Sequence, residues 1–65
     1  MARGTVAEFD EDRGLGTIDS EGRRFPFHCT QITDGTRTIP VGTAVTFDVV
    51  PGHLGTWEAV SITPA

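Results

Sequence analysis

Apolar and polar residues alternate along several short segments of this chain, and turn residues separate the segments. A period of two is typical of strands that bury one face and expose the other. The clearest example is the segment 43–50, where Val45, Phe47 and Val49 alternate with small or polar residues. On this pattern we expect strands at residues 3–10, 15–19, 23–30, 43–50 and 56–63.

Side-chain parity then predicts which residues reach the core. Phe25 and Phe27 share one face of the third strand, so both rings are expected to point inward. Pro26 between them has no N–H, and its nitrogen is therefore expected to face a sheet edge or a bulge. Val60 and Ile62 are expected together on one face of the last strand.

Two places depart from simple alternation. Val6 and Phe9 are three positions apart in the first strand, which predicts a bulge near residues 7–8. A single helical turn is expected at 30–32, and no longer window carries a helical period.

Short strands in so small a chain cannot make an open sheet with two buried faces. We therefore predict one all-β domain over residues 1–65, a small five-stranded barrel with a single core.

Composition agrees with this fold and limits the function. Threonine, valine, isoleucine, phenylalanine and tryptophan, which favour strands, make up 25 of the 65 residues. Nine acidic residues stand against five arginines and no lysine, a net charge of −4 that argues against binding nucleic acid by bulk positive charge. Residues 1–4 lack the apolar stretch of a secretory signal, and no apolar run approaches the roughly 18 residues of a membrane helix. The single cysteine, Cys29, cannot form an intramolecular disulfide, so a cytoplasmic location is expected.

Several segments resemble the bacterial cold-shock domain in order and spacing: 4–6, 13–18, 25–28 and 42–47, together with Phe9. The resemblance extends along nearly the whole chain. It implies an antiparallel five-stranded barrel of the oligonucleotide-binding type, with single-stranded RNA or DNA as the ligand. The family motifs read Lys-Gly-Phe-Gly-Phe-Ile on the second strand and Val-Phe-Val-His-Phe on the third. Arg13 stands at the motif lysine and His28 at the motif histidine.

The chain departs from the family where the ligand would lie. Aromatic positions of the family fall on non-aromatic residues here, namely Glu8, Leu15, Thr17, Pro26, Cys29 and Thr36. In the family, bases stack on outward rings, and one stacked base contributes about 1–3 kcal/mol. These departures predict that a module of cold-shock type here binds nucleic acid with weakened affinity, binds it through other groups, or binds another ligand.

Six residues are candidate contacts to nucleic acid: Phe9, Arg13, Leu15, His28, Arg37 and Trp57. An outward ring or aliphatic surface, as at His28 and Leu15, would meet bases, whereas Arg13 and Arg37 would meet phosphates. Trp57 stands where the family has no tryptophan, and it would replace a lost stacking ring. By the resemblance, the loop that contains His53 would border the same groove.

Structural roles compete with these assignments. Arg13 would also serve as a solvated turn residue paired with Glu11 or Asp12. Trp57 would also serve as a lid packed over the core. The basic pair 23–24 is interpreted as a charged hairpin tip that protects a sheet edge.

Catalysis and metal binding find little support in the sequence. The soft metal ligands are His28, Cys29 and His53, and adjacent strand residues such as the first two point to opposite faces. No hydrolase motif or phosphate-binding glycine loop occurs. We therefore expect no cofactor, no metal and no enzymatic activity.

A different class of function uses the same barrel. The face that the family lines with rings is smoother here, because it carries Ala7, Leu15, Thr17 and Pro26. Together with the acidic balance of the chain, such a face suits a basic protein partner or a homodimer. Protein interaction is thus the alternative to nucleic-acid binding.

Overall fold

Five strands and one short helical turn make up the described part of the computed structural model, which covers residues 1–52 and 55–65. The strands are β1 Ala2–Asp10, β2 Leu15–Ser20, β3 Arg23–His28, β4 Ala44–Pro51 and β5 Trp57–Pro64, and a 3-10 turn, η1 Cys29–Gln31, follows β3. Every expected strand is present. Within the described ranges, no helix is long and apolar enough to cross a membrane.

The third strand ends earlier than predicted, and the helical turn begins one residue before its expected start at Thr30. His28 caps the turn, because its ring nitrogen accepts a hydrogen bond from the Thr30 amide at 3.2 Å. Side-chain capping of this kind ends a strand and satisfies an amide that the turn leaves free. The predicted extension of the third strand to Thr30 is therefore wrong.

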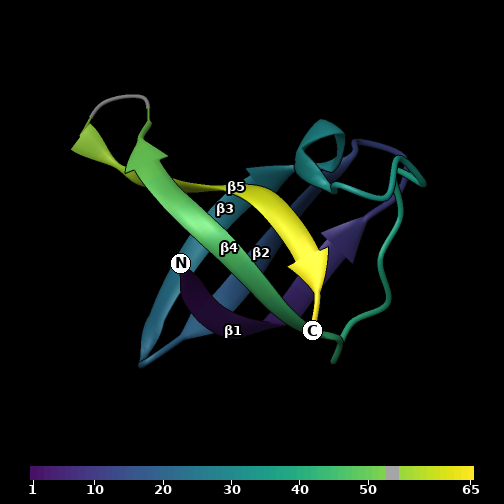
Figure 1. The fold of residues 1–65 in the computed structure, drawn as a ribbon. Coiled ribbons are helices and arrows are strands. Elements are labelled where there is room, and N and C mark those ends of the chain that lie inside the picture. The colour runs from purple at the N-terminus through teal and green to yellow at the C-terminus, as the bar shows by residue number, and fades with distance from the viewer. Residues whose placement is uncertain (53–54) are drawn as a thin grey trace.

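All neighbouring strands are antiparallel, and they form one sheet in the order β3-β2-β1-β4-β5. In Figure 1, β4 and β5 cross in front of β2 and β3, so the sheet curls back over itself and β3 comes to face β5. One parallel bridge, between Ile32 and Ile62, ties the segment after η1 to β5. The prediction of an all-β fold with five antiparallel strands is confirmed.

Two irregularities set the side-chain faces of β1 and β5. The register of β1 against β2 shifts between Val6 and Glu8, which confirms the predicted bulge. In β5 the expectation for Val60 and Ile62 is wrong, because Ile62 is buried together with Ala59 while Val60 is only half-buried. Ser61 has φ 53°, a left-handed conformation that breaks the alternation at this point.

The core lies inside the curl of the sheet. It consists of Val6, Ile18, Phe27, Ile32, Ile39, Val45, Phe47, Ala59 and Ile62. Phe27 is 3% exposed, and Phe25 packs against this cluster with its ring 5.6 Å from that of Phe47. The inward orientation predicted for Phe25 and Phe27 is thus confirmed, and the two rings are not available as an outer stacking surface.

Candidate nucleic-acid interface

The outer face of β1, β2 and β3 presents its side chains in rows that run across the strands. One row holds Glu8, Thr17 and Pro26, and the next holds Asp10, Leu15 and His28. Side chains at directly opposed positions lie close enough to act on one ligand together. These two rows contain the motif positions that the sequence indicated.

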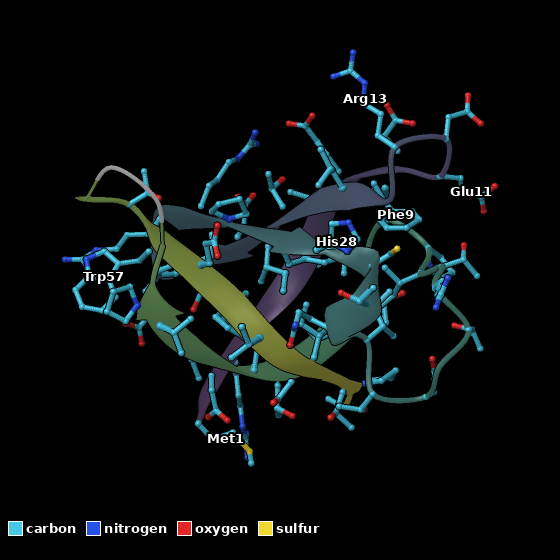
Figure 2. All side chains as sticks on the ribbon, turned by 90° about the horizontal axis from the view of Figure 1, so that it is seen from above. Met1, Phe9, Glu11, Arg13, His28 and Trp57 are labelled. Atoms are coloured by element: carbon cyan, nitrogen blue, oxygen red, sulfur yellow. The ribbon has the colours of Figure 1, made fainter. Side chains whose placement is uncertain are left out.

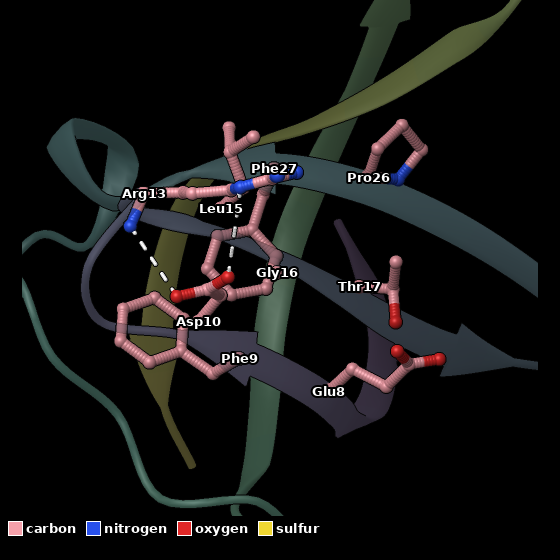
Figure 3. Close-up of a pocket in the computed structure, with 9 residues that line it drawn as sticks. All are labelled: Glu8, Phe9, Asp10, Arg13, Leu15, Gly16, Thr17, Pro26 and Phe27. Carbon is pink, nitrogen blue, oxygen red and sulfur yellow. Dashed lines mark hydrogen bonds and ion pairs between the residues drawn. The ribbon is translucent and has the colours of Figure 1, made fainter.

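A groove of about 350 Å³ opens over these rows. Figure 3 shows the residues that line it: Glu8, Phe9, Asp10, Arg13, Leu15, Gly16, Thr17, Pro26 and Phe27. A second groove, of about 220 Å³, is lined by Leu15, Pro26, Phe27, His28, Gln31, Glu58, Ala59 and Val60. Leu15, Pro26 and Phe27 belong to both, so the two grooves form one continuous surface from β1 to β5.

A pair of stacked rings underlies the first groove. The rings of Phe9 and Phe27 lie 6.0 Å apart and are nearly parallel, with 9° between their planes. Gly16 lies between them in the register. A Cβ atom at Gly16 would lie 2.5 Å from Cζ of Phe27 and 2.7 Å from the carbonyl oxygen of Glu8. The groove therefore depends on glycine at this position.

The substitution Gly16→Ala is expected to lower the free energy of unfolding by about 1–3 kcal/mol, the usual cost of overpacking a closed site. Urea denaturation followed by circular dichroism measures the change. Adding Phe27→Val in the same chain removes the obstructing ring edge, so the double variant should lose less than the sum of the two single variants. An unchanged midpoint for Gly16→Ala would contradict the contact.

Pro26 lies on the edge strand β3, opposite Thr17. The Cys29 amide donates to the carbonyl oxygen of Gly14 at 2.7 Å, and hydrogen-bonded pairs recur at every second residue of an antiparallel ladder. The pair formed by Thr17 and Pro26 therefore falls between two such pairs. The proline nitrogen faces away from β2, which confirms the predicted edge position.

Three of the candidate residues, Phe9, Arg13 and Leu15, line the first groove, and His28 lines the second beside Leu15. Leu15 is 47% exposed, so its aliphatic surface is open to a ligand. Arg13 pairs with Asp10, at 3.9 Å between Nε and Oδ2, rather than with Glu11 or Asp12 as expected.

Arg37 and Trp57 line neither groove. Figure 2 shows Trp57 at the opposite end of the molecule from Arg13, and it lines neither groove. Trp57 is 54% exposed at the start of β5, which does not fit a lid packed over the core. Arg37 is exposed in the loop between η1 and β4, with φ 58°. His53 lies outside the described residues.

The loop around Arg37 is ordered by its own polar contacts. Asp34 accepts hydrogen bonds from the amide of Thr36 at 3.0 Å and from its hydroxyl at 2.8 Å. The bond from the backbone amide, and then the bond from the hydroxyl, hold the pKa of the Asp34 carboxyl below its usual value.

Sequence reasoning missed several residues that the fold brings to the surface. Gln31 and Glu58 line the second groove, but they come from η1 and β5, and only the curl of the sheet places them beside His28. Arg24 was interpreted as part of a hairpin tip, yet it forms ion pairs with both Glu8 and Asp19. Ala7 was expected on the smooth face, but it does not line the first groove, because the bulge presents Glu8 there instead.

Metal-ligating side chains do not gather within the described residues. No group of three histidine, cysteine, aspartate or glutamate side chains there has an arrangement that would hold an ion. His28 instead contacts Thr30, with Nδ1 3.0 Å from the threonine hydroxyl.

Fold and outer face together define a small all-β module with one continuous groove from β1 to β5. Residues 2–65 match the family described as the "'Cold-shock' DNA-binding domain", and the chain belongs to this family.

Relatives of similar length support the assignment. The chain is 38% identical over 68 residues to the cold shock protein ScoF of Streptomyces coelicolor, and the match covers 100% of both chains. It is 42% identical over 65 residues to the major cold shock protein of Streptococcus pyogenes, covering 97% of this chain and 96% of that one.

A solved structure supports the fold. Drosophila Unr CSD456 superposes with a TM-score of 0.81 at 27% sequence identity. The match covers 98% of this chain and 26% of that one, so the chain spans about a quarter of the longer protein. The predictions of an oligonucleotide-binding type of fold and of a nucleic-acid-binding module of cold-shock type are confirmed.

Proposed function

We propose that this protein binds single-stranded RNA or DNA over β1, β2 and β3, without catalysis and with low affinity. One observation carries the low affinity. The outward positions at the centre of the groove are Leu15, Thr17 and Pro26, none of which offers a flat ring to a base. Since stacking on rings supplies much of the affinity of such modules, apolar contact, the half-buried ring of Phe9 and the ring of His28 are left to hold the bases.

Charge lowers the affinity further. Glu8 and Asp10 line the groove, and Arg13 in its lining and Arg24 beside Glu8 are already paired with carboxylates. Few phosphates are therefore neutralised when a strand binds. Each neutralised phosphate adds roughly −0.7 to the slope of log K against log salt for single strands.

The expected result is weak binding with a shallow salt dependence, a slope below about 2 in magnitude. An NMR titration at low salt with an oligothymidylate strand of about eight nucleotides measures both the affinity and the surface involved. Amide shifts should concentrate at Phe9, Arg13, Leu15 and His28. Repeating the titration at several salt concentrations gives the slope.

Two outcomes would count against this function. Absence of shifts at millimolar oligonucleotide would exclude binding, and a steep slope would mean that other basic groups meet the phosphates. Shifts of the same amides on raising the protein concentration alone would favour the homodimer. Shifts with a basic peptide but not with the oligonucleotide would favour a protein partner.

A cytoplasmic location stays a prediction from the single cysteine.

A further inference from the structure

The side chain of Arg24 lies across the outer face of the sheet. Its Nη1 atom is 2.9 Å from Oε1 of Glu8, and its Nε atom is 2.8 Å from Oδ1 of Asp19. Arg24 belongs to β3, Asp19 to β2 and Glu8 to β1, so one guanidinium joins three neighbouring strands. The contact to Glu8 passes over β2 at the edge of the first groove, which Glu8 lines.

The three side chains are accessible to a ligand. The exposed fractions are 59% for Arg24, 66% for Glu8 and 50% for Asp19. Ion pairs at such exposure contribute little to stability, because water and salt screen them. A competing anion can therefore separate the pairs without unfolding the sheet.

Phosphate is the anion whose chemistry fits. A guanidinium presents several N–H donors in a planar fork, which matches a phosphate as well as a carboxylate. The two carboxylates now occupy donors that a nucleic-acid backbone would otherwise use. Arg24 is thus a cation beside the groove that its own neighbours keep neutralised.

Glu8 has another donor within its surroundings. Thr17 is its direct partner across β1 and β2, and the Thr17 Oγ1 atom is buried without a hydrogen-bond partner. In Figure 3 the Glu8 carboxylate and the Thr17 hydroxyl point toward one another. Rotation of the Glu8 carboxylate toward Thr17 would release Arg24 and give the carboxylate a donor that is unused in the free protein.

We infer that Arg24 is a phosphate-binding residue of this interface and that Glu8 competes with the nucleic-acid backbone for it. This inference rests on the proposed function and adds a residue that sets the affinity. The competition makes binding weak, because a phosphate has to displace Glu8 before Arg24 contributes. The same competition explains why the slope of log K against log salt should be shallow, although an arginine lies beside the groove.

The test is a double-mutant cycle with Glu8→Gln and Arg24→Gln, titrated with the same oligothymidylate at low salt. Glu8→Gln should tighten binding by about two- to fivefold, the range of one exposed ion pair. It should also steepen the salt slope by about 0.7, since one more phosphate is neutralised. Arg24→Gln alone should change the affinity by less, and in the Glu8→Gln background it should remove the gain.

A matched control separates release of Arg24 from a general loss of negative charge. Glu58→Gln removes the same charge from the rim of the second groove, and Glu58 is not among the carboxylates that pair with Arg24. Thermal denaturation of each variant verifies that it is folded. The inference would be overturned if Glu8→Gln and Glu58→Gln tightened binding equally, or if the effects of Glu8→Gln and Arg24→Gln on binding were additive. Either result would leave the proposed weak binding by the unmodified protein intact. No binding by any variant would overturn the proposed function as well.

Discussion

Replacing Phe47 by alanine is expected to lower the free energy of unfolding by about 3–5 kcal/mol, the usual cost of removing a buried phenylalanine. Phe47 is 1% exposed in β4, and its ring packs against that of Phe25. A chain of this length buries only about 60% of the surface that its unfolded form exposes, so its stability is modest from the start. Most of the molecules should consequently be unfolded at room temperature.

Circular dichroism during thermal and urea denaturation measures this loss. Val50→Ala is a matched control on the same strand, because Val50 is 36% exposed and its truncation should change the free energy of unfolding by no more than about 0.5 kcal/mol. If Phe47→Ala unfolds at the same temperature as the unmodified protein, the core described above is incorrect.

Restoring rings to the groove should have the largest effect on binding. The double variant Leu15→Phe with Pro26→Phe places two outward rings on adjacent strands, at positions that both grooves share. Each stacked base contributes about 1–3 kcal/mol, so the affinity for single strands should rise at least about tenfold. Fluorescence anisotropy of a labelled oligothymidylate measures the change.

Exposed apolar rings also raise non-specific binding, so the control has to carry the same chemistry elsewhere. Val41→Phe with Val50→Phe adds two rings at exposed aliphatic positions that line neither groove. This variant should bind as the unmodified protein does. Equal affinity for both double variants would show that bases do not stack over β2 and β3.

Much of the fold could be predicted because local spacing determines it. The alternation around Phe25 and Phe27 gave their inward orientation, and the distance between Val6 and Phe9 gave the bulge in β1. These patterns report which face of a strand is buried, since the side-chain period of a strand is two. The face of Val60 was mispredicted because the left-handed conformation of Ser61, which lies between Val60 and Ile62, broke that period.

The candidate site was less predictable, because it depends on register between strands. The sequence places Glu8 and Arg24 far apart, and only the order of β1, β2 and β3 brings their side chains together. Glu58 was equally unpredictable, because only the curl of the sheet brings it to the second groove. The family motifs pointed to Leu15 and His28. The ion pairs of Arg24 with Glu8 and Asp19, by contrast, involve residues outside those motifs.

Pro26 bears on how copies of this protein behave when they are crowded. An unpaired strand at the margin of a sheet is a template on which identical chains can assemble into fibrils. Here an incoming strand would meet a pyrrolidine ring midway along β3 instead of a donor, so a continuous intermolecular ladder cannot form along that margin. The residue that deprives the groove of a stacking ring thereby also removes one backbone donor from the outer edge of β3.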